Sequence, residues 1–464
     1  MEVPHLVSAW NAYVQQLTNT FTKPTATLWM QIALGWLLHR GPATVTGIIR
    51  TLGDCADRHW TVYHKFFYRA SWDLRELSAM LLLRILYPLI QQAARRDELT
   101  GKPIVDLHLD DTTAGRYGRH VAHAGWYKDA SCCGPAYKGT VIHWAHNWIV
   151  GCVTLRLANW PLVRWALPMI FELYRKAADC DTQHPFRTRQ QIAAAMVAQA
   201  ASILPDVLWR ICVDGQYATR DMVRGLPKGV TLVSRIRSDA ALHQLPSGKR
   251  CHGKTRGPIP KKGDRLASIK ELAASAKDWQ TITLEHQGRS VQRQVASVVC
   301  LWWHVCREKP IRLVIVRDPS GKQKDDYFFC TDATASEQEI VQRAADRWGV
   351  EEAIMEAKQH LGFENTRGWC SRTVNRQAPL AMVLLTLVKV WYAQAAITTR
   401  QLLPVATPWF TQKERPSFLD MLAALRRVLW QHRIASKANS SNSCLALKVQ
   451  KFFDNVSYVL CQAA

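Results

Sequence analysis

The chain has 464 residues, of which 48% are hydrophobic and 21% are charged. This length and composition exclude a disordered chain and are typical of a folded protein with two or three domains. Lys and Arg number 60 against 37 Asp and Glu, and the resulting net charge of +23 favours nucleic acid as a polyanionic partner over a merely basic globular protein.

Residues 1–98 have apolar positions at helical spacing and few strand signals, so we expect a helical domain there. Two short helical patterns, 44–53 and 59–69, are separated by a turn. The second pattern combines Lys65 and Arg69 with an apolar face, which favours a helix-turn-helix in which these two residues contact DNA. An ordinary helical hairpin is the alternative. The first residues are too polar for a signal peptide.

The alternating run 104–111 (IVDLHLDD) predicts a strand that ends in Asp110 and Asp111. Further elements follow within a predicted first core segment, 99–229: strand candidates at 140–157 and 207–213 and a helix at about 187–203. The second of these strands leads directly into Asp214. Strand, helix and strand in this order predict an α/β sheet.

Residues 230–335 predict a mostly β insertion. Its strand-like runs are 231–236, 281–284, 295–301, 311–316 and 327–330. A loop rich in Gly, Pro and basic residues, 246–265, supplies Lys254, Lys261 and Lys262 as candidate DNA contacts.

Helical patterns return from residue 336. They cover about 336–362, 376–397 and 416–433, which we divide between a second core segment at 336–400 and a helical C-terminal region at 401–464. The apolar run 378–397 is interrupted by Lys389 and predicts a buried core helix, not a membrane span.

The 13 cysteines show no CxxC spacing. Cys132 and Cys133 are adjacent, and His143 and His146 follow them at distances that match no standard zinc site. Reduced thiols in a cytoplasmic protein are the simpler interpretation.

The helix around residue 351 carries three charges on one side. Arg347, Glu351 and Lys358 fall within about 20° of their mean direction at 100° per residue. Apolar positions lie within about 80° of that direction, namely Ile340, Ala344, Trp348, Ile354 and Met355. Polar residues occupy the opposite face: Gln342, Asp346, Glu356 and His360. Charges that project from an apolar stripe predict a functional cleft, and an internal Arg347–Glu351 ion pair with Lys358 reaching solvent is the alternative.

Acids at strand ends of an α/β sheet lie where such folds bind ligands. Asp111 and Asp214 both follow strands, and Glu351 would add a third carboxylate from a helix. Three such groups can hold a pair of Mg²⁺ ions for phosphodiester chemistry. A helix cap or a turn is the alternative for each aspartate taken singly.

Three blocks of sequence carry a resemblance. DDTT at 110–113, VDGQ at 213–216 and RWGVEEAIMEAKQHLG at 347–362 resemble the motifs of cut-and-paste bacterial insertion-sequence transposases of the DDE superfamily. The third block has the R-x3-E-x6-K part of that family's Y-x2-R-x3-E-x6-K signature, but Ala344 replaces the tyrosine. The missing phenol puts a hairpin route of strand cleavage in doubt.

The resemblance implies a ribonuclease-H-like catalytic core interrupted by a β insertion, with helical DNA-binding and C-terminal regions. It implies Asp111, Asp214 and Glu351 as catalytic ligands of Mg²⁺, with Mn²⁺ as a substitute. Asp111 is preferred to Asp110 because it directly precedes the Thr-Thr pair. The DNA contacts that it implies or that lie beside the motif are Arg347, Lys358, Arg235, Trp348 and Tyr327, with core packing as the alternative for Tyr327.

We therefore expect a bacterial cytoplasmic, nucleoid-associated transposase that cleaves terminal inverted repeats and joins them to target DNA. We expect a homodimer in the DNA complex and no membrane partner. A structure-directed nuclease or resolvase would use the same chemistry. A domesticated, non-catalytic DNA-binding regulator is the alternative from another class, and an RNA-binding module is disfavoured because its aromatic strand motifs are missing.

Overall fold

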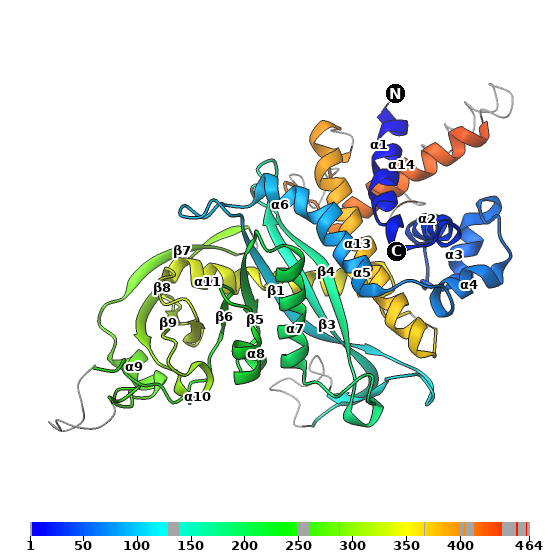
Figure 1. Cartoon of the computed structure of the whole chain (residues 1–464). Coiled ribbons are helices and arrows are strands. Elements are labelled where there is room, and N and C mark those ends of the chain that lie inside the picture. Colours follow the sequence, from blue (N-terminus) through cyan, green and yellow to red (C-terminus); the bar gives the residue numbers. More distant parts are fainter. Residues whose placement is uncertain are drawn as a thin grey trace.

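The strand-forming segments join into one ten-stranded mixed sheet in the computed structural model (Figure 1). The structure describes residues 2–128, 139–247, 259–286, 288–365, 367–399, 402–404 and 413–438, and the single residues 452 and 461. Helices cover both faces of this sheet, and a helical region lies at one end of the molecule (Figure 1). The α/β class predicted from the sequence is confirmed at this level.

The strands β1 to β4, at one end of the sheet, pair in antiparallel fashion. β3 (Ile142–Arg156) pairs with β1 (Ile104–Gly115) along one edge. Its other edge is shared by β4 (Arg164–Tyr174) and the short β2 (Gly125–Lys128). Residues 145–155 of β3 are buried because both faces of the sheet are covered.

The neighbouring strands are parallel. β5 (Leu208–Val213) runs parallel to β1, and β6 (Thr231–Arg235) runs parallel to β5. α7 (Arg189–Ile203) precedes β5, and α8 (Arg220–Gly225) precedes β6. Thr188 starts α7 by accepting a hydrogen bond from the backbone of Gln191, whose side chain bonds back to form a capping box.

Beyond β6 the sheet continues with antiparallel strands. In spatial order these are β10 (Asp326–Cys330), β9 (Ile311–Arg317), β8 (Arg289–Cys300) and β7 (Gln280–His286). The short helices α9 (Ile269–Ser275) and α10 (Trp303–Cys306) accompany them. A second hydrophobic cluster, which includes Val314, Phe328 and Ile340, forms where this part of the sheet meets α11 (Glu337–Asp346).

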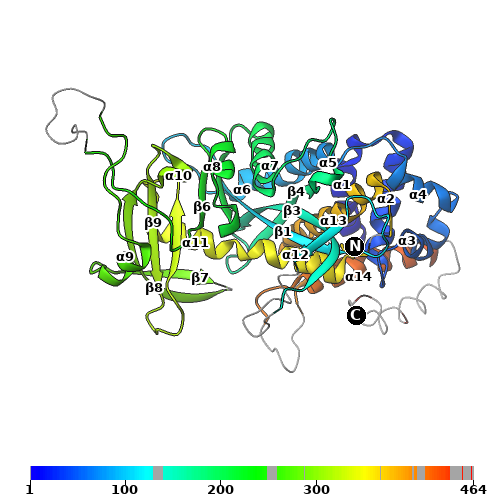
Figure 2. The same ribbon diagram turned by 90° about the horizontal axis from the view of Figure 1, so that it is seen from below.

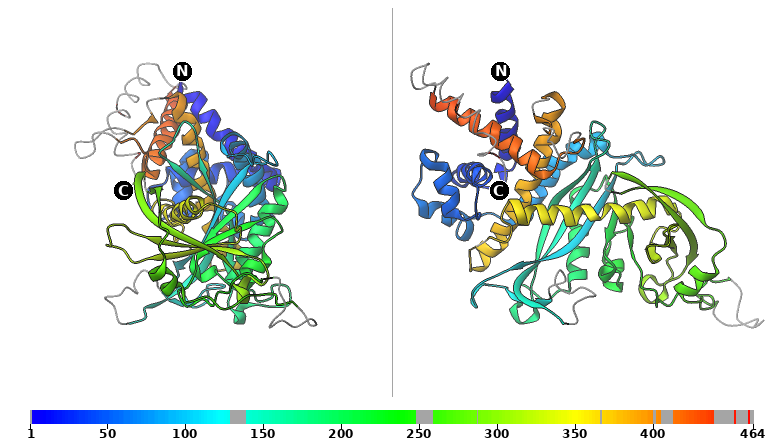
Figure 3. Two further views of the ribbon diagram at one scale, coloured as in Figure 1. Left: turned by 90° about the vertical axis from the view of Figure 1, so that its left-hand side faces the viewer. Right: turned by 180° about the vertical axis from the view of Figure 1, so that it is seen from behind.

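The two faces of the sheet carry different helices. α7 and α8 lie on one face (Figure 1), whereas α11 and the following α12 (Trp348–His360) run across the other face (Figure 3). Side chains alternate along a strand, so neighbouring residues of β1 point to opposite faces. Asp110 and Asp111 are therefore presented to different helices.

A bundle of helices forms the remaining end of the molecule, opposite β7, β8 and β9 (Figure 2). Its α-helices are α1 (Glu2–Gln16), α2 (Lys23–Leu38), α3 (Val45–Leu52), α4 (Trp60–Tyr68), α5 (Leu74–Met80), α6 (Tyr87–Ala93), α13 (Ser371–Thr398) and α14 (Phe418–Ala438). Short helical elements of this bundle are η1 (Thr18–Thr20), η2 (Gly53–Cys55) and the π-helical η3 (Leu81–Leu86), whereas η4 (Ala177–Asp179) and η5 (Gly215–Tyr217) follow the strands β4 and β5. The buried residues of these helices share one continuous core with the sheet.

Three arginines from α13 and α14 fix the N-terminal helices in place. They donate to carbonyl oxygens in the last turn of a helix: Arg376 to Phe67 (3.2 Å), Arg426 to Leu37 (2.6 Å) and Arg433 to Thr51 (2.8 Å). The last carbonyls of a helix have no partner within the helix, and a cation there also complements the helix dipole. The expected helical pair at 44–53 and 59–69, seen as α3 and α4, is thus attached to the C-terminal helices α13 and α14.

Two elements show where tertiary context matters. β4 was not expected from the sequence, and its Pro168 lies at a register shift opposite Gly151 and Cys152, where a bulge tolerates the missing N–H. α13 is long and apolar enough to cross a membrane, but 83% of its most apolar window is buried inside the protein. That burial matches the core helix predicted at 378–397.

Candidate active site

An open cavity of about 480 Å³ lies where the end of β1 meets α12. It is lined by Asp110, Asp111, Thr112, Glu351, Ile354, Met355, Lys358, Gln359 and Glu364. Acids therefore reach it from a strand, from a helix and from the segment after that helix.

Arg347 joins two of these acids. Its Nη1 donates to Oδ2 of Asp110 at 2.6 Å, and its Nη2 donates to Oε1 of Glu351 at 2.7 Å. The Arg347 and Asp110 side chains are 18% and 14% exposed, and that of Glu351 is 33% exposed. The predicted Arg347–Glu351 ion pair is present, but it is half of a bridge that ties α12 to β1.

Burial dominates the electrostatics of this bridge. It raises the pKa of Asp110 to about 7, although Arg347 acts to lower it, and the nearby Asp111 and Glu351 raise it further. Burial alone would lower the pKa of Arg347, but Asp110, Glu351 and then Asp214 raise it above its usual value. Asp214 directly follows Val213, which pairs with Leu109, so the backbones of Asp214 and Asp110 leave neighbouring strands side by side.

Asp111 points to the opposite face and is enclosed by four donors. Its carboxylate accepts from Asn147 (2.8 Å) and Arg189 (2.8 Å) on one oxygen and from Gln216 (2.6 Å) and Tyr217 (3.0 Å) on the other. Its side chain is 8% exposed. Burial, with Asp111 adding to it, raises the pKa of Tyr217 far above its usual range, so this phenol stays a donor. The side chain of Asp111 is a structural acceptor in this arrangement.

Asp214 follows β5 and starts η5. Its carbonyl oxygen accepts from Oγ of Ser234 at 3.1 Å, which links the ends of β5 and β6. Arg235 follows on β6 with a half-exposed side chain that pairs with Asp326 at 3.1 Å. These contacts hold the Asp214 turn at the same end of the sheet as the acids of β1, because β1, β5 and β6 are parallel.

Lys358 lies on one side of the cavity, two helical turns after Glu351 on α12. Its Nζ donates to the carbonyl oxygen of Thr113 at 2.7 Å and pairs with Glu364 at 2.9 Å. The side chain is 25% exposed, so it lies at the cavity wall and does not extend freely into solvent.

A buried arginine–histidine pair holds the segment after α12. Arg116 donates from Nε to Nδ1 of His146 at 2.7 Å and from Nη1 to the carbonyl oxygen of Glu364 at 2.8 Å. Nε2 of His146 lies 2.8 Å from the carbonyl oxygen of Ala122, so Nε2 carries the proton and Nδ1 accepts. Burial, and then Arg116, lowers the pKa of His146 to about 3, so this histidine is neutral.

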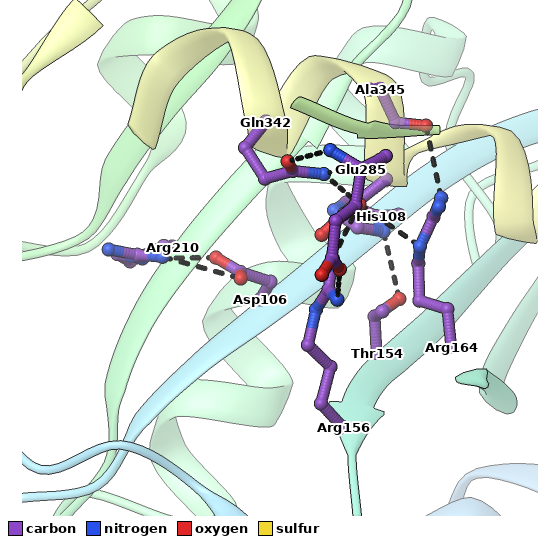
Figure 4. Close-up of polar contacts among 10 residues, drawn as sticks. Asp106, His108, Thr154, Arg156, Arg164, Arg210, Glu285, Gln342 and Ala345 are labelled. Atoms are coloured by element: carbon purple, nitrogen blue, oxygen red, sulfur yellow. Dashed lines mark hydrogen bonds and ion pairs between the residues drawn. The ribbon is translucent and has the colours of Figure 1, made fainter. Parts of the chain in front are cut away.

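Polar contacts anchor α11, and through it α12, to the sheet (Figure 4). Two of the contacts drawn there join α11 to strands: Arg164 of β4 donates to the carbonyl oxygen of Ala345 (3.2 Å), and the backbone N–H of Glu285 of β7 donates to Gln342 (2.9 Å). Two others link neighbouring strands, Arg210 with Asp106 (3.0 Å) and His108 with Thr154 (2.9 Å). Arg343 of α11 is 3% exposed and lies 3.4 Å from Asp106. The backbone that carries Arg347 is therefore fixed by contacts on both sides of the helix.

The predicted division of this helix into an inner apolar face and an outer polar face is wrong. Trp348 and Met355 are 43% and 49% exposed, whereas Asp346 is 6% exposed. Glu356 forms an ion pair with the buried Lys389 at 2.6 Å. The reason is that α12 is in contact with both the sheet and α13, so the supposed outer face is covered.

The oxygen donors suit Mg²⁺, but their arrangement does not form a metal site. Among the residues that the structure describes, no three His, Cys, Asp or Glu side chains are grouped closely enough to hold a metal ion. Asp111 and Glu351 of the predicted triad lie on different faces of the sheet, and Asp110 and Glu351 are occupied by Arg347.

The other predicted contact residues are spread over the surface. Lys65 and Arg69 are exposed at the end of α4, Lys261 pairs with Glu308 (2.6 Å), Lys262 lies over the Trp303 ring, and Tyr327 is half-buried against the core. Lys254, Cys132 and Cys133 lie outside the described residues. The described cysteines are free thiols.

The sequence did not reveal the residues that enclose Asp111. Gln216 had a local signal, because it stands in the VDGQ block two positions after Asp214. Arg189 and Asn147 had none, since their approach to Asp111 depends on how α7 and β3 pack against β1. The contact between Arg116 and His146 likewise had no local signal, because it depends on the pairing of β1 with β3.

The fold and the cavity define an α/β protein with acids grouped where a strand end meets a helix. The chain belongs to the family described as DDE superfamily endonuclease, which matches residues 16–293. That match contains Asp110, Asp111 and Asp214 and ends before α12, so it does not include Glu351.

One solved structure shows a similarity to this chain. The piggyBac transposase synaptic complex with hairpin DNA is 12% identical and aligns over 93% of this chain and 79% of its own, with a TM-score of 0.38. No curated protein matches the sequence.

Proposed function

We propose that the protein is a DNA transposase that binds terminal inverted repeats, cleaves the element ends and joins the 3′-hydroxyls to target DNA. The observation that carries this proposal is the meeting of Asp110 from β1 and Glu351 from α12 at one open cavity, beside Arg347 and Lys358. Membership of an endonuclease family and a net charge of +23 support it.

Our proposed acidic set is Asp110, Asp214 and Glu351. Asp110 replaces Asp111 as the first acid because it faces Glu351, whereas four donors enclose Asp111. Magnesium, with manganese as a substitute, is the cofactor that we propose, since carboxylate oxygens are the ligands it prefers. Arg347 and Lys358 are the proposed phosphate contacts at the cleaved end.

We interpret the sheet as a ribonuclease-H-like core. Three successive antiparallel strands, β4, β3 and β1, followed by the parallel β5 and β6, support this interpretation. The strands from β7 to β10, which extend the sheet before α11, correspond to the proposed β insertion.

Further DNA contacts are proposed at exposed basic positions away from the cavity. Lys65 and Arg69 would contact the terminal repeat from α4, and Arg235 would contact a phosphate near Asp214. Strand joining needs two DNA ends, so we propose a homodimer in the DNA complex, acting in the bacterial cytoplasm.

The proposal is tested by nicking of duplex DNA that carries the inverted repeats flanking the gene. We expect Mg²⁺-dependent nicking by the wild type and a loss of at least about a thousandfold in Glu351→Gln, because an essential carboxylate is removed. Glu352→Gln is the matched control, since Glu352 is the next residue of α12 but lines a different cavity.

Two outcomes would contradict the catalytic proposal. The first is DNA binding without metal-dependent cleavage of any candidate end, which is what a non-catalytic regulator would show. The second is equal nicking by the wild type and Glu351→Gln.

A further inference from the structure

The position of Arg347 carries a consequence for how the acidic site is used. We propose that Arg347 closes this site in the free protein, and that a DNA phosphate opens it by drawing the guanidinium away from Asp110 and Glu351. Metal binding and DNA binding would then be coupled through one side chain. This inference rests on the proposed function, and it adds an order of events to it.

Arg347 occupies both acids at once. Separate guanidinium nitrogens donate to Asp110 at 2.6 Å and to Glu351 at 2.7 Å. Charge-assisted bonds of this kind are about twice as strong as bonds between neutral groups. A guanidinium is always protonated in proteins, so it places one positive charge between the two carboxylates, where a divalent ion would place two. Arg347 therefore competes directly with a metal for the same oxygen atoms.

The arrangement of the acids agrees with a closed state. Within the described ranges, no set of three ligating side chains is close enough to hold an ion. Glu351 is held by Arg347, and Lys358 is held by Glu364 and the carbonyl oxygen of Thr113. A metal would have to displace the guanidinium before it could gather the carboxylates.

Opening the site requires a side chain to move, not a helix. The helix that carries Arg347 is anchored by the polar cluster of Figure 4, in which Gln342 bonds to the β7 backbone and Arg164 bonds to Ala345. Arg347 itself is partly exposed, at 18%, and it bonds to Asp110 and Glu351, which line the open cavity. A phosphate in the cavity can therefore reach the guanidinium while the backbone stays in place.

A phosphodiester is a suitable competitor for this guanidinium. It offers two oxygens to the planar fork of an arginine, as a carboxylate does. The net charge of +23 attracts DNA, which raises the local concentration of phosphate groups. Exchange of two carboxylates for a phosphate frees Asp110 and Glu351 together, so DNA favours the state that binds metal. By linkage, metal must favour DNA binding to the same degree.

The next residue of β1 supplies an internal control. Arg189 pairs with Asp111 at 2.8 Å, much as Arg347 pairs with Asp110, but on the opposite face of the sheet. Three further donors, Asn147, Gln216 and Tyr217, enclose Asp111. Removal of Arg189 should therefore free no carboxylate for a metal.

The first test measures binding of Mn²⁺ to the full chain without DNA, by the electron paramagnetic resonance signal of free Mn²⁺. We expect Arg347→Gln to bind Mn²⁺ about tenfold more tightly than the wild type, because the competing cation is removed. The lysine of Arg347→Lys cannot bridge both acids, so the Mn²⁺ affinity of this variant should lie between those of the wild type and Arg347→Gln. Arg189→Gln should match the wild type.

Either of two results would overturn the inference: unchanged Mn²⁺ affinity in the folded Arg347 variants, or a gain confined to Arg189→Gln. Circular dichroism establishes folding, and Arg347→Lys retains a cation in case Arg347→Gln is unstable. Asp110→Asn added to Arg347→Gln should abolish the gain, and its persistence would also count against the inference.

The second test uses the reciprocal coupling. In EDTA, an arbitrary blunt DNA duplex should bind Glu351→Gln more tightly than the wild type, by about threefold or more, because Arg347 is released to the phosphate. Glu352→Gln removes the same charge but leaves the Arg347–Glu351 bond intact, so its affinity for the DNA duplex should rise less. Equal gains in the two variants would mean that only net charge matters. Neither test depends on DNA cleavage. The coupling of metal and DNA binding can therefore fail while the proposed transposase activity holds, and the activity can fail while the coupling holds.

Discussion

The two faces of the sheet treat adjacent carboxylates of β1 in different ways. On the α12 face, Asp110 meets a single arginine that it shares with Glu351 beside an open cavity. On the α7 face, Asp111 accepts four hydrogen bonds and is 8% exposed. The chemical groups are identical, and only the side of the strand differs.

This difference supports our proposal that Asp110 is the reactive acid and Asp111 a structural one. A carboxylate has about four lone-pair sites, and Asp111 has donors for all of them, which leaves none for a metal or a substrate. Asp110 has one cationic partner and a pKa raised to about 7 by burial, so a stronger cationic partner would stabilise it. The incompletely satisfied acid is the one suited to chemistry.

The largest expected effect is on DNA cleavage. Asp110→Asn should reduce Mg²⁺-dependent nicking by at least about a thousandfold, because it removes a carboxylate that faces Glu351. Asp111→Asn, assayed at a temperature where it is folded, should lose less than about tenfold, since the Asp111 carboxylate is used by its four hydrogen bonds. The measurement is the single-turnover nicking rate of both variants on one substrate. The reverse order of activities would make Asp111 the catalytic acid.

The sequence predicted much of the fold because its strands and helices have strong local patterns. The strand at 104–111 and the helix at about 187–203 appear as β1 and α7 with bounds shifted by a few residues. The bulged β4 was not predicted, since Pro168 interrupts its pattern and only pairing with β3 makes it a strand. The pairing of β6 with β10 joins segments about a hundred residues apart, and no local signal encodes it.

The site was predicted less completely. Helical spacing put Arg347, Glu351 and Lys358 together, and all three lie at or beside the cavity. The choice between Asp110 and Asp111 depended on which face of β1 meets α12, and a sequence does not specify that. The same limit applies to the donors around Asp111, which come from α7, β3 and η5.

The second prediction concerns stability. Here Asp111→Asn should be the more damaging substitution, whereas for DNA cleavage it is Asp110→Asn. Asp111→Asn should lower the free energy of unfolding by about 3 kcal/mol, because it leaves Arg189 without its buried partner and disturbs three other bonds. Asp110→Asn should cost less than about 1 kcal/mol, because Arg347 keeps Glu351. Urea unfolding at pH 7 measures both values. Equal losses would show that Asp110 is as firmly embedded as Asp111.

The smallest expected effect tests whether the α12 face is open throughout or only at Asp110. His146 lies on this face, opposite Ala114, and is closed between Arg116 and Ala122 with a pKa lowered to about 3. The unfolded histidine has a pKa of about 6.5, so between these values the unfolded state binds the extra proton. Stability must therefore fall as the pH drops below about 6.5, and this group should account for a loss of roughly 2 kcal/mol between pH 7 and pH 5.

His146→Gln isolates that contribution, because it removes the titrating group while His108, whose pKa is also lowered to about 3 by burial, remains in both proteins. The difference in unfolding free energy between pH 7 and pH 5 should be smaller in the variant by about 2 kcal/mol. Urea titrations of both proteins at the two pH values give this difference. If the two differences are equal, His146 is solvated and protonated in the folded state, and the segment that Arg116 holds against Glu364 is open as well. A difference of the expected size would confine the opening on this face to the cavity around Asp110 and Glu351.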